Sequence, residues 1–318
     1  MEMLIKSADD KQPDIDALTA LQERSDLDAS TRRRIEQEIR TIRAGITGER
    51  DAAYEIDFHF RDSPKRVVIH DLRIEVDGRV AQIDHLMINR LLDIWVCESK
   101  HFAEGVGVND NGEWVAFWKG RPRGIPSPVE QNRKHIAVLN DAFEKGLVRL
   151  PKRLGITLKP QIHGFILVSS GARISRPKGP AAARVDGLDT VVKVDQFAAT
   201  INKQIEDMSM VSTFGAIPRL ISTKALEDIG KQLAAIHRPS QVDWAARFGL
   251  SSAIAVPRTA GPLAVPAASP AADQTCASCG SIVSPKVASY CEANAQRLAS
   301  RILCWDCQRR RPKPAAGA

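Results

Sequence analysis

Long apolar runs are missing from this chain of 318 residues, although 43% of its residues are hydrophobic. No stretch of eighteen apolar residues occurs, so the sequence predicts no membrane span. The first residues, MEMLIKSADDKQ, lack the apolar segment of a secretory signal. We therefore expect a cytoplasmic protein with enough apolar residues to build a substantial core.

Cysteine is scarce over most of the chain. Only Cys97 lies in the main body, whereas five cysteines fall in the last 43 residues, which contain no histidine. This segregation favours a metal site in a reducing compartment over disulfide bonds.

Two Cys-x-x-Cys pairs in this final segment predict a structural zinc site with four thiolate ligands. The ligands would be Cys276, Cys279, Cys304 and Cys307, and 24 residues separate the two pairs, more than in a usual zinc ribbon. Cys291 lies midway and either replaces one of the four or is a small buried residue; we favour the second reading.

Positive charge also gathers at the end of the chain. The net charge is +7, and seven basic against two acidic residues in the last 43 give this segment +5, leaving +2 for everything before it. Such a tail suits a polyanionic partner such as DNA. A solubilising tail is the alternative reading.

The stretch from Gln82 to Lys100 carries the most informative charges. It reads as two apolar strands joined by a polar turn, with Asp84 in the first and Glu98 and Lys100 on one face of the second. Charged groups in an apolar hairpin need partners. Two carboxylates suit Mg²⁺ (or Mn²⁺), and an ammonium beside them suits a phosphodiesterase. An ordinary salt bridge on a strand edge is the alternative.

Apolar patterns elsewhere predict the surrounding elements. Helices are expected from Thr31 onward and, as a second stretch, over 45–60, with Glu49 on a core-facing stripe. Strands over 66–118 predict an antiparallel meander, with Asp77-Gly78 as one of its turns. A helix beginning at Ser127-Pro128 and a buried strand over 162–168 then imply a parallel neighbour. The predicted fold is therefore α/β with a mixed sheet.

We expect five regions along the chain, and the bounds of the second follow from the family resemblance given below. They are an N-terminal helical region (1–44), a catalytic domain (45–205), a helical extension (206–250), a Pro/Ala-rich linker (251–275) and a zinc-binding module (276–313).

Four motifs in order resemble the nuclease-related domain (NERD) family, a branch of the PD-(D/E)XK nuclease superfamily. They are Gly48-Glu49, Gln82-Ile83-Asp84-His85, Glu98-Ser99-Lys100 and Pro128-x-x-Gln131, and the resemblance covers roughly residues 45–170. It implies a restriction-endonuclease-like α/β/α core. The cysteine-rich tail resembles the topoisomerase-type zinc modules to which family members are fused.

The resemblance also implies a role for each matching residue. Asp84 and Glu98 would ligate Mg²⁺, Lys100 would act on the attacking water, Glu49 would be an outer ligand, and Gln131 would position water or substrate. His85 is expected to be a supporting or core histidine rather than a base, because it lies on the opposite strand face from Asp84.

These observations predict a metal-dependent nuclease that cleaves DNA, single- or double-stranded, in DNA processing or repair, with the zinc module assisting binding. The alternative is a non-catalytic DNA-binding or scaffold protein that uses a nuclease-like fold. The oligomeric state has no signature in the sequence.

Overall fold

The structure is a computed structural model, and it describes residues 3–178, 185–211, 219–250, 274–283, 285–293, 300–304 and 307–308. The chain divides into two compact units, Met1–Ser252 and Ala253–Ala318, which we treat separately. Among the described residues, no helix is both long and apolar enough to cross a bilayer. Most of the predicted linker, residues 251–273, lies outside the described part, and the five predicted regions stay predictions.

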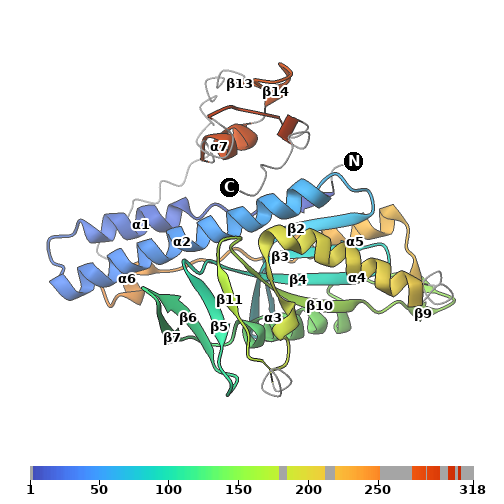
Figure 1. The fold of residues 1–318 in the computed structure, drawn as a ribbon, viewed down its shortest axis with the longest axis horizontal. Helices are drawn as coiled ribbons and strands as arrows, with labels where there is room; N and C mark the ends of the chain where they lie inside the picture. The colour runs from blue at the N-terminus through green and yellow to red at the C-terminus, as the bar shows by residue number, and fades with distance from the viewer. Residues whose placement is uncertain are drawn as a thin grey trace, which may run out of the picture. The chain divides into compact units, whose positions relative to one another are not determined.

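A six-stranded mixed sheet forms the centre of the first unit, in the order β1-β2-β3-β4-β10-β12 (Figure 1). Its strands are β1 (Leu4–Lys6), β2 (Arg66–Val76), β3 (Arg79–Asn89), β4 (Asp93–Lys100), β10 (Gln161–Val168) and β12 (Val191–Lys193). β2, β3 and β4 are antiparallel neighbours, whereas β10 is parallel to β4, and β12 to β10. The predicted mixed sheet with a parallel neighbour is confirmed.

The turn between β2 and β3 has the geometry that its sequence predicts. Asp77 and Gly78 adopt φ angles of 51° and 72°. Two consecutive positive φ values match the right-handed twist of a hairpin, and aspartate followed by glycine adopts them readily. This turn holds the two eleven-residue strands of the hairpin in register.

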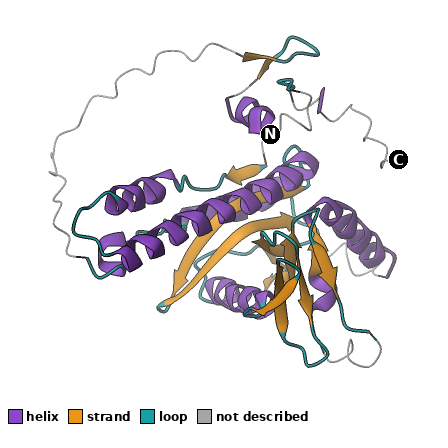
Figure 2. Cartoon of the chain, turned by 60° about the vertical axis from the view of Figure 1, so that its left-hand side comes forward, coloured by secondary structure: helices purple, strands orange, loops and turns teal. Residues whose placement is uncertain are grey.

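Helices cover both faces of the sheet (Figure 2). The four covering helices are α2 (Ala29–Phe60), α3 (Pro128–Glu144), α4 (Phe197–Val211) and α5 (Thr223–Ala235). Ile56 of α2 and Phe197 of α4 share one buried cluster with Trp95 of β4. Leu139 of α3 and Leu226 of α5 join the cluster on the other face. This arrangement is the predicted α/β/α core.

The prediction of two separate helices over residues 31–60 is wrong. α2 is one helix of 32 residues, with the Asp28 side chain accepting hydrogen bonds from Ser30 N and Thr31 N at its start. Its first half packs against α1 (Gln12–Gln22) and α6 (Trp244–Arg247) in a shared apolar cluster. This packing outweighs the low helix propensity of the two glycines in its middle.

The predicted single meander over 66–118 is also wrong, because it divides into two sheets. β5 (Gly105–Val108), β6 (Trp114–Trp118) and β7 (Arg121–Gly124) join β11 (Arg173–Ser175) in a separate sheet of order β11-β5-β6-β7, which we call the wing. β5 cannot extend the central sheet, because β4 already pairs with β3 on one edge and with β10 on the other. The remaining short elements of this unit are β8 (Lys152–Arg153), β9 (Ile156–Thr157) and the 3₁₀ turns η2 (Leu188–Thr190) and η3 (Val194–Gln196).

The second unit is built around its cysteines. β13 (Gln274–Thr275) pairs with β14 (Ile282–Val283), and α7 (Pro285–Ala293) follows. The chain turns back after Cys276, whose carbonyl accepts a hydrogen bond from Gly280 N at 2.9 Å. Gly280 has φ 72°, which glycine adopts without strain. Ala277 N donates to Ile302 O at 2.8 Å and so joins the two Cys-x-x-Cys segments.

Candidate active site

Asp84 lies where β3 and β4 stop pairing. The ladder between these strands extends as far as the pair His85 and Cys97. Beyond it, Asp84 Oδ2 accepts a hydrogen bond from the backbone N–H of Ser99 at 2.7 Å. The carboxylate thus replaces a strand partner and is fixed against the end of β4, beside Glu98.

Glu98 has one occupied carboxylate oxygen and one free of hydrogen bonds. Lys100 Nζ and Gln131 Nε2 both donate to its Oε1, at 2.7 and 2.8 Å. Its Oε2 accepts no hydrogen bond from the described residues, although His135 Nδ1 lies 3.4 Å away. The Glu98 side chain is only 4% exposed. His135 thus lies within ion-pair distance of this buried oxygen without a well-formed hydrogen bond, and a cation would give the oxygen a stronger partner.

The two carboxyls differ in their pKa. Burial, then the charges of Glu98 and Glu49, raises the pKa of Asp84 well above its ordinary value. Burial also opposes ionisation of Glu98, but His135 and Lys100 outweigh it and lower the pKa of that carboxyl. Glu98 therefore carries the negative charge most readily. A divalent cation between the two groups would favour ionisation of Asp84 as well.

Glu49 reaches this region from α2, and its carboxylate pairs with Lys11, which is not one of the predicted catalytic residues. Its Oε2 accepts a hydrogen bond from Lys11 Nζ at 2.6 Å. α2 approaches the end of β4 closely here, since a Cβ added to Gly48 would lie 2.9 Å from His101 Cβ. Burial raises the pKa of Glu49, although Lys11 opposes this shift. The structure thus brings Glu49 near Asp84, with the Lys11 ammonium at its carboxylate.

Asp71 adds a fourth carboxylate, on β2. It has φ 53°, and the β2–β3 register omits it together with Asp84, the residue it would face. Gln82 Nε2 donates to its Oδ1 at 2.9 Å, and Asp9 N donates to its Oδ2 at 3.2 Å. Both carboxylate oxygens of Asp71 therefore accept hydrogen bonds from the protein. Asp71 contributes negative charge to the site rather than a free ligand atom.

The irregularity at Asp71 and Asp84 reverses the strand alternation. Ile83 and Leu86 of β3 lie in the same core cluster, although a regular strand would put them on opposite faces. The alternation of β3 is therefore interrupted between Ile83 and Leu86, at the position of Asp84.

A buried hydrogen-bonded relay lies behind the site. His70 Nε2 is 3.1 Å from Asp57 Oδ1, the two Nδ1 atoms of His70 and His85 are 2.8 Å apart, and His85 Nε2 is 2.7 Å from Ser99 Oγ. Because a carboxylate only accepts, the neutral arrangement is unique: Ser99 donates to His85, His85 to His70, and His70 to Asp57. The relay fixes Ser99, whose N–H holds Asp84. His85 thus supports β4 from within the core.

The carboxylates fit a magnesium ion held by few protein ligands. Asp84 and Glu98 offer hard oxygen donors, and the unsatisfied Glu98 Oε2 is the atom that a cation would complete. Within the described residues, no three carboxylates have oxygens within 4.8 Å of one another. Mg²⁺ usually keeps several waters, so two protein carboxylates are enough to hold it.

Four cysteines converge in the second unit. The Sγ atoms of Cys276, Cys279, Cys304 and Cys307 all lie within 4.8 Å of one another. Zinc–sulfur bonds of about 2.3 Å in a tetrahedron separate sulfurs by roughly 3.8 Å, so the cluster fits zinc. Burial opposes ionisation of Cys276, but backbone N–H donors of Cys304, Ser278 and Cys279 lower its pKa to about 6.

Cys291 lies apart from this cluster. Its side chain is buried, and its sulfur accepts hydrogen bonds from Leu303 N and Gln308 Nε2, both at 3.4 Å. These contacts support its reading as a small buried residue, although the ligand assignment stays a prediction.

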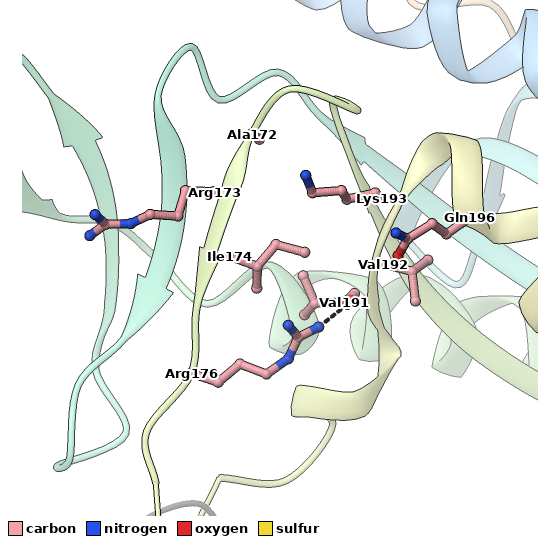
Figure 3. Close-up of a pocket in the computed structure, with 8 residues that line it drawn as sticks. All are labelled: Ala172, Arg173, Ile174, Arg176, Val191, Val192, Lys193 and Gln196. Carbon is pink, nitrogen blue, oxygen red and sulfur yellow. Dashed lines mark hydrogen bonds between the residues drawn. The ribbon is translucent and has the colours of Figure 1, made fainter. Parts of the chain in front are cut away.

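A cavity of about 330 Å³ lies elsewhere, between β11 and β12 (Figure 3). Arg176 donates to Val191 O at 2.6 Å and Lys193 donates to Ser170 O at 2.9 Å. Figure 3 shows Arg173 turned away from the cavity, and its guanidinium lies over the Phe117 ring at 4.4 Å. No carboxylate lines this cavity, so it is not the candidate metal site.

Comparison with protein families identifies the region that holds these groups. Residues 44–169 match the family model described as nuclease-related domain. This segment is a nuclease-related domain. The match includes all five predicted catalytic residues, and it indicates a nuclease-like function with nucleic acid as substrate or partner. No curated protein and no solved structure shows a significant match to the chain.

Three residues of the site were not predicted from the sequence. His135 lies one helical turn after Gln131, so the helix stripe that begins with Gln131 contained a signal for it. Asp71 is a carboxylate within an apolar strand, and the argument used for Asp84 applies to it equally. Lys11 lies outside the nuclease-related domain, in a polar segment without any motif.

Proposed function

We propose that this protein is a metal-dependent nuclease that hydrolyses phosphodiester bonds of DNA. The observation that carries the proposal is the convergence on Glu98. Lys100 and Gln131 meet one of its oxygens, and the other is buried without a hydrogen bond, beside Asp84. Asp84 and Glu98 would hold Mg²⁺ or Mn²⁺, which supplies charge stabilisation at the phosphate and a more acidic water.

The remaining roles belong to the side chains themselves. Lys100 holds an ammonium at Glu98 and is about a third exposed, so it can reach a phosphate oxygen or take part in proton transfer. Gln131 donates to the same oxygen and orients the carboxylate. Glu49 is the outer acidic group, and the relay behind Ser99 keeps Asp84 in place.

The wing supports a nucleic acid as the substrate. Three of its four strands, β5, β6 and β7, lie in the chain between Lys100 and Gln131, and its outer strand β7 is fully exposed. Lys119, Arg121 and Arg123 project from this hairpin, where no described carboxylate pairs with their side chains, and Trp118 is 51% exposed. Cations beside an exposed ring suit phosphates and unstacked bases.

The cysteine module is proposed to bind zinc and to assist nucleic-acid binding. Its four thiols fit the metal, and the last 43 residues carry a net charge of +5. Most of these basic residues lie outside the described part of the chain, so this role rests on charge alone.

The test is cleavage of circular single-stranded and supercoiled DNA with Mg²⁺, Mn²⁺ or EDTA. Wild-type protein should nick or linearise DNA only with a divalent metal. Lys100→Ala should lose roughly a hundredfold to a thousandfold in rate, because it removes a cation from the reacting phosphate. Lys224→Met is a matched control on α5, with a side chain that is 83% exposed, and it should cut normally.

Retained cleavage by Lys100→Ala would refute the assigned site. If no protein cuts either DNA, yet all bind it with a steep salt dependence, the protein is a nucleic-acid-binding scaffold instead. An RNA substrate under the same conditions separates a ribonuclease from an inactive protein.

A further inference from the structure

The N-terminal strap, residues 3–11, brings a lysine into the acidic site. Lys11 Nζ lies 2.6 Å from Glu49 Oε2, and its side chain is 23% exposed. The charges of Asp71 and Asp84 also act on this ammonium. The Lys11 ammonium thus lies near three carboxylates, those of Glu49, Asp71 and Asp84.

The strap is tied to the site's own strands. β1 pairs in parallel with β2, and Lys6 Nζ donates to the carbonyl oxygens of His70 and Asp71 at 3.2 and 2.9 Å. Asp9 N donates to Asp71 Oδ2, and Asp9 Oδ2 is 2.9 Å from His237 Nε2. These contacts fix the strap up to Asp9, so the backbone that carries Lys11 is held while its long side chain retains rotational freedom.

The strap also lies outside the nuclease-related domain, which begins at residue 44. Nothing in the domain's motifs therefore requires a lysine at this place. The Lys11 ammonium nevertheless lies beside carboxylates that suit a divalent cation.

We propose that Lys11 is a built-in counter-ion that holds Glu49 and competes with divalent metal, so that it sets the affinity of the site. The inference rests on the proposed metal-dependent function. An ammonium near Glu49 and Asp84 repels an incoming Mg²⁺ and occupies a carboxylate oxygen. Metal binding requires Lys11 to release Glu49, and its flexible stem allows the ammonium to turn toward solvent.

The competing explanation is that Lys11 only orients Glu49. The two explanations predict opposite changes in metal affinity when the charge of Lys11 is removed. If Lys11 competes, removal of its charge makes the site more negative and tightens metal binding. If Lys11 orients Glu49, removal of the charge loosens Glu49 and weakens binding.

The experiment measures Mn²⁺ binding to the zinc-loaded full chain without nucleic acid, by the loss of the free Mn²⁺ signal in electron paramagnetic resonance. Lys11→Met should bind Mn²⁺ about tenfold more tightly than wild type, which equals ~1.4 kcal/mol. Lys11→Gln keeps a hydrogen-bond donor without the charge and should also bind more tightly. Lys11→Arg keeps the charge and should bind like wild type.

Two controls separate the causes. Lys224→Met removes one positive charge from α5, where the side chain is 83% exposed, and should leave affinity unchanged. Asp84→Asn should abolish binding. Circular dichroism checks that each variant is folded. If Lys11→Met does not fold, the comparison uses Lys11→Gln.

Unchanged or weaker binding in the two neutral variants would overturn the counter-ion role. Weaker binding in both, restored by Lys11→Arg, would assign Lys11 to orientation of Glu49. If the counter-ion role fails in this way but wild type binds Mn²⁺ and Asp84→Asn does not, the proposed metal-dependent function still stands. If no variant binds Mn²⁺, both the proposed function and this inference fail.

Discussion

At the scale of single residues, the position of His85 explains how an apolar sheet supports a charged site. His85 is 1% exposed, and it faces His70 on β2, Ser99 on β4 and, through His70, Asp57 on α2. Burial, then the nearby His70 and Lys11, lowers the pKa of His85 well below its ordinary value. His85 is therefore neutral in the native state at neutral pH.

This relay predicts a loss of stability in acid. An unfolded histidine binds its proton near pH 6.5, whereas native His85 does not, so the stabilisation is present above about pH 6.5 and is lost as the pH falls. The free energy of unfolding should fall by at most ~1.4 kcal/mol per pH unit from this group. His85→Gln should flatten that slope in urea titrations between about pH 7.5 and 5.

Ser99→Ala provides the matched control for this prediction. It removes the hydroxyl that His85 accepts from, and it should lower stability at every pH without flattening the slope. An equal slope in His85→Gln and wild type would show that another group is responsible.

The residue scale also shows where sequence reasoning stops. Asp84, Glu98, Lys100 and Gln131 were predicted from charges in apolar surroundings and from ordered motifs, and the structure brings them together. Lys11 could not be predicted, because its contact with Glu49 spans 38 positions and depends on how α1 packs on α2. Long-range contacts of polar side chains leave no periodic pattern in a sequence.

At the scale of elements, two helical glycines predict opposite effects of the same substitution. A Cβ at Gly230 of α5 would lie 2.7 Å from Val67 Cγ1 and 3.0 Å from Ile5 Cγ1. A Cβ at Gly45 of α2 would meet only Glu49 Oε1, at 3.7 Å. Alanine favours helix by ~1 kcal/mol over glycine, whereas overpacking a core costs about 1–3 kcal/mol.

Gly45→Ala should therefore stabilise the protein by up to ~1 kcal/mol, and Gly230→Ala should destabilise it. The urea midpoint of unfolding should rise in Gly45→Ala and fall in Gly230→Ala, each compared with wild type. A stabilised Gly230→Ala would mean that α5 can move away from β1 and β2 without cost.

Element types were predicted more accurately than their connections. The strand over 162–168 and the helix after Ser127 formed as expected, because apolar runs and capping residues act locally. The wing was missed because strand pairing depends on which sheet edges remain free. The continuity of α2 was missed because tertiary packing, not local propensity, carries the helix through its glycines.

At the scale of the whole molecule, the two compact units predict separate responses to metal removal. Wild type should contain about one zinc per chain by elemental analysis, because four thiols converge. Replacing both Cys276 and Cys279 by serine should abolish zinc binding and unfold the small unit. The thermal transition of Met1–Ser252 should not move, since this unit has its own cores.

Cys291→Ala is the control for the zinc site. Cys291 is buried outside the thiol cluster, so the variant should keep its zinc even if the small unit loses stability. Zinc lost from Cys291→Ala, or a wild-type ratio near zero, would contradict the four-thiol assignment.

The edge of β2 that does not pair with β3 is covered by other parts of the chain. This eleven-residue apolar strand would otherwise present unpaired backbone groups to other molecules, which invites intermolecular strand addition. β1 and Lys6 cover its first half, and beyond them His237 Nδ1 accepts from Arg73 N while Arg238 N donates to Arg73 O. The same strap that supplies Lys11 thus guards against aggregation, so an N-terminal truncation that removes it would first be noticed as insoluble protein.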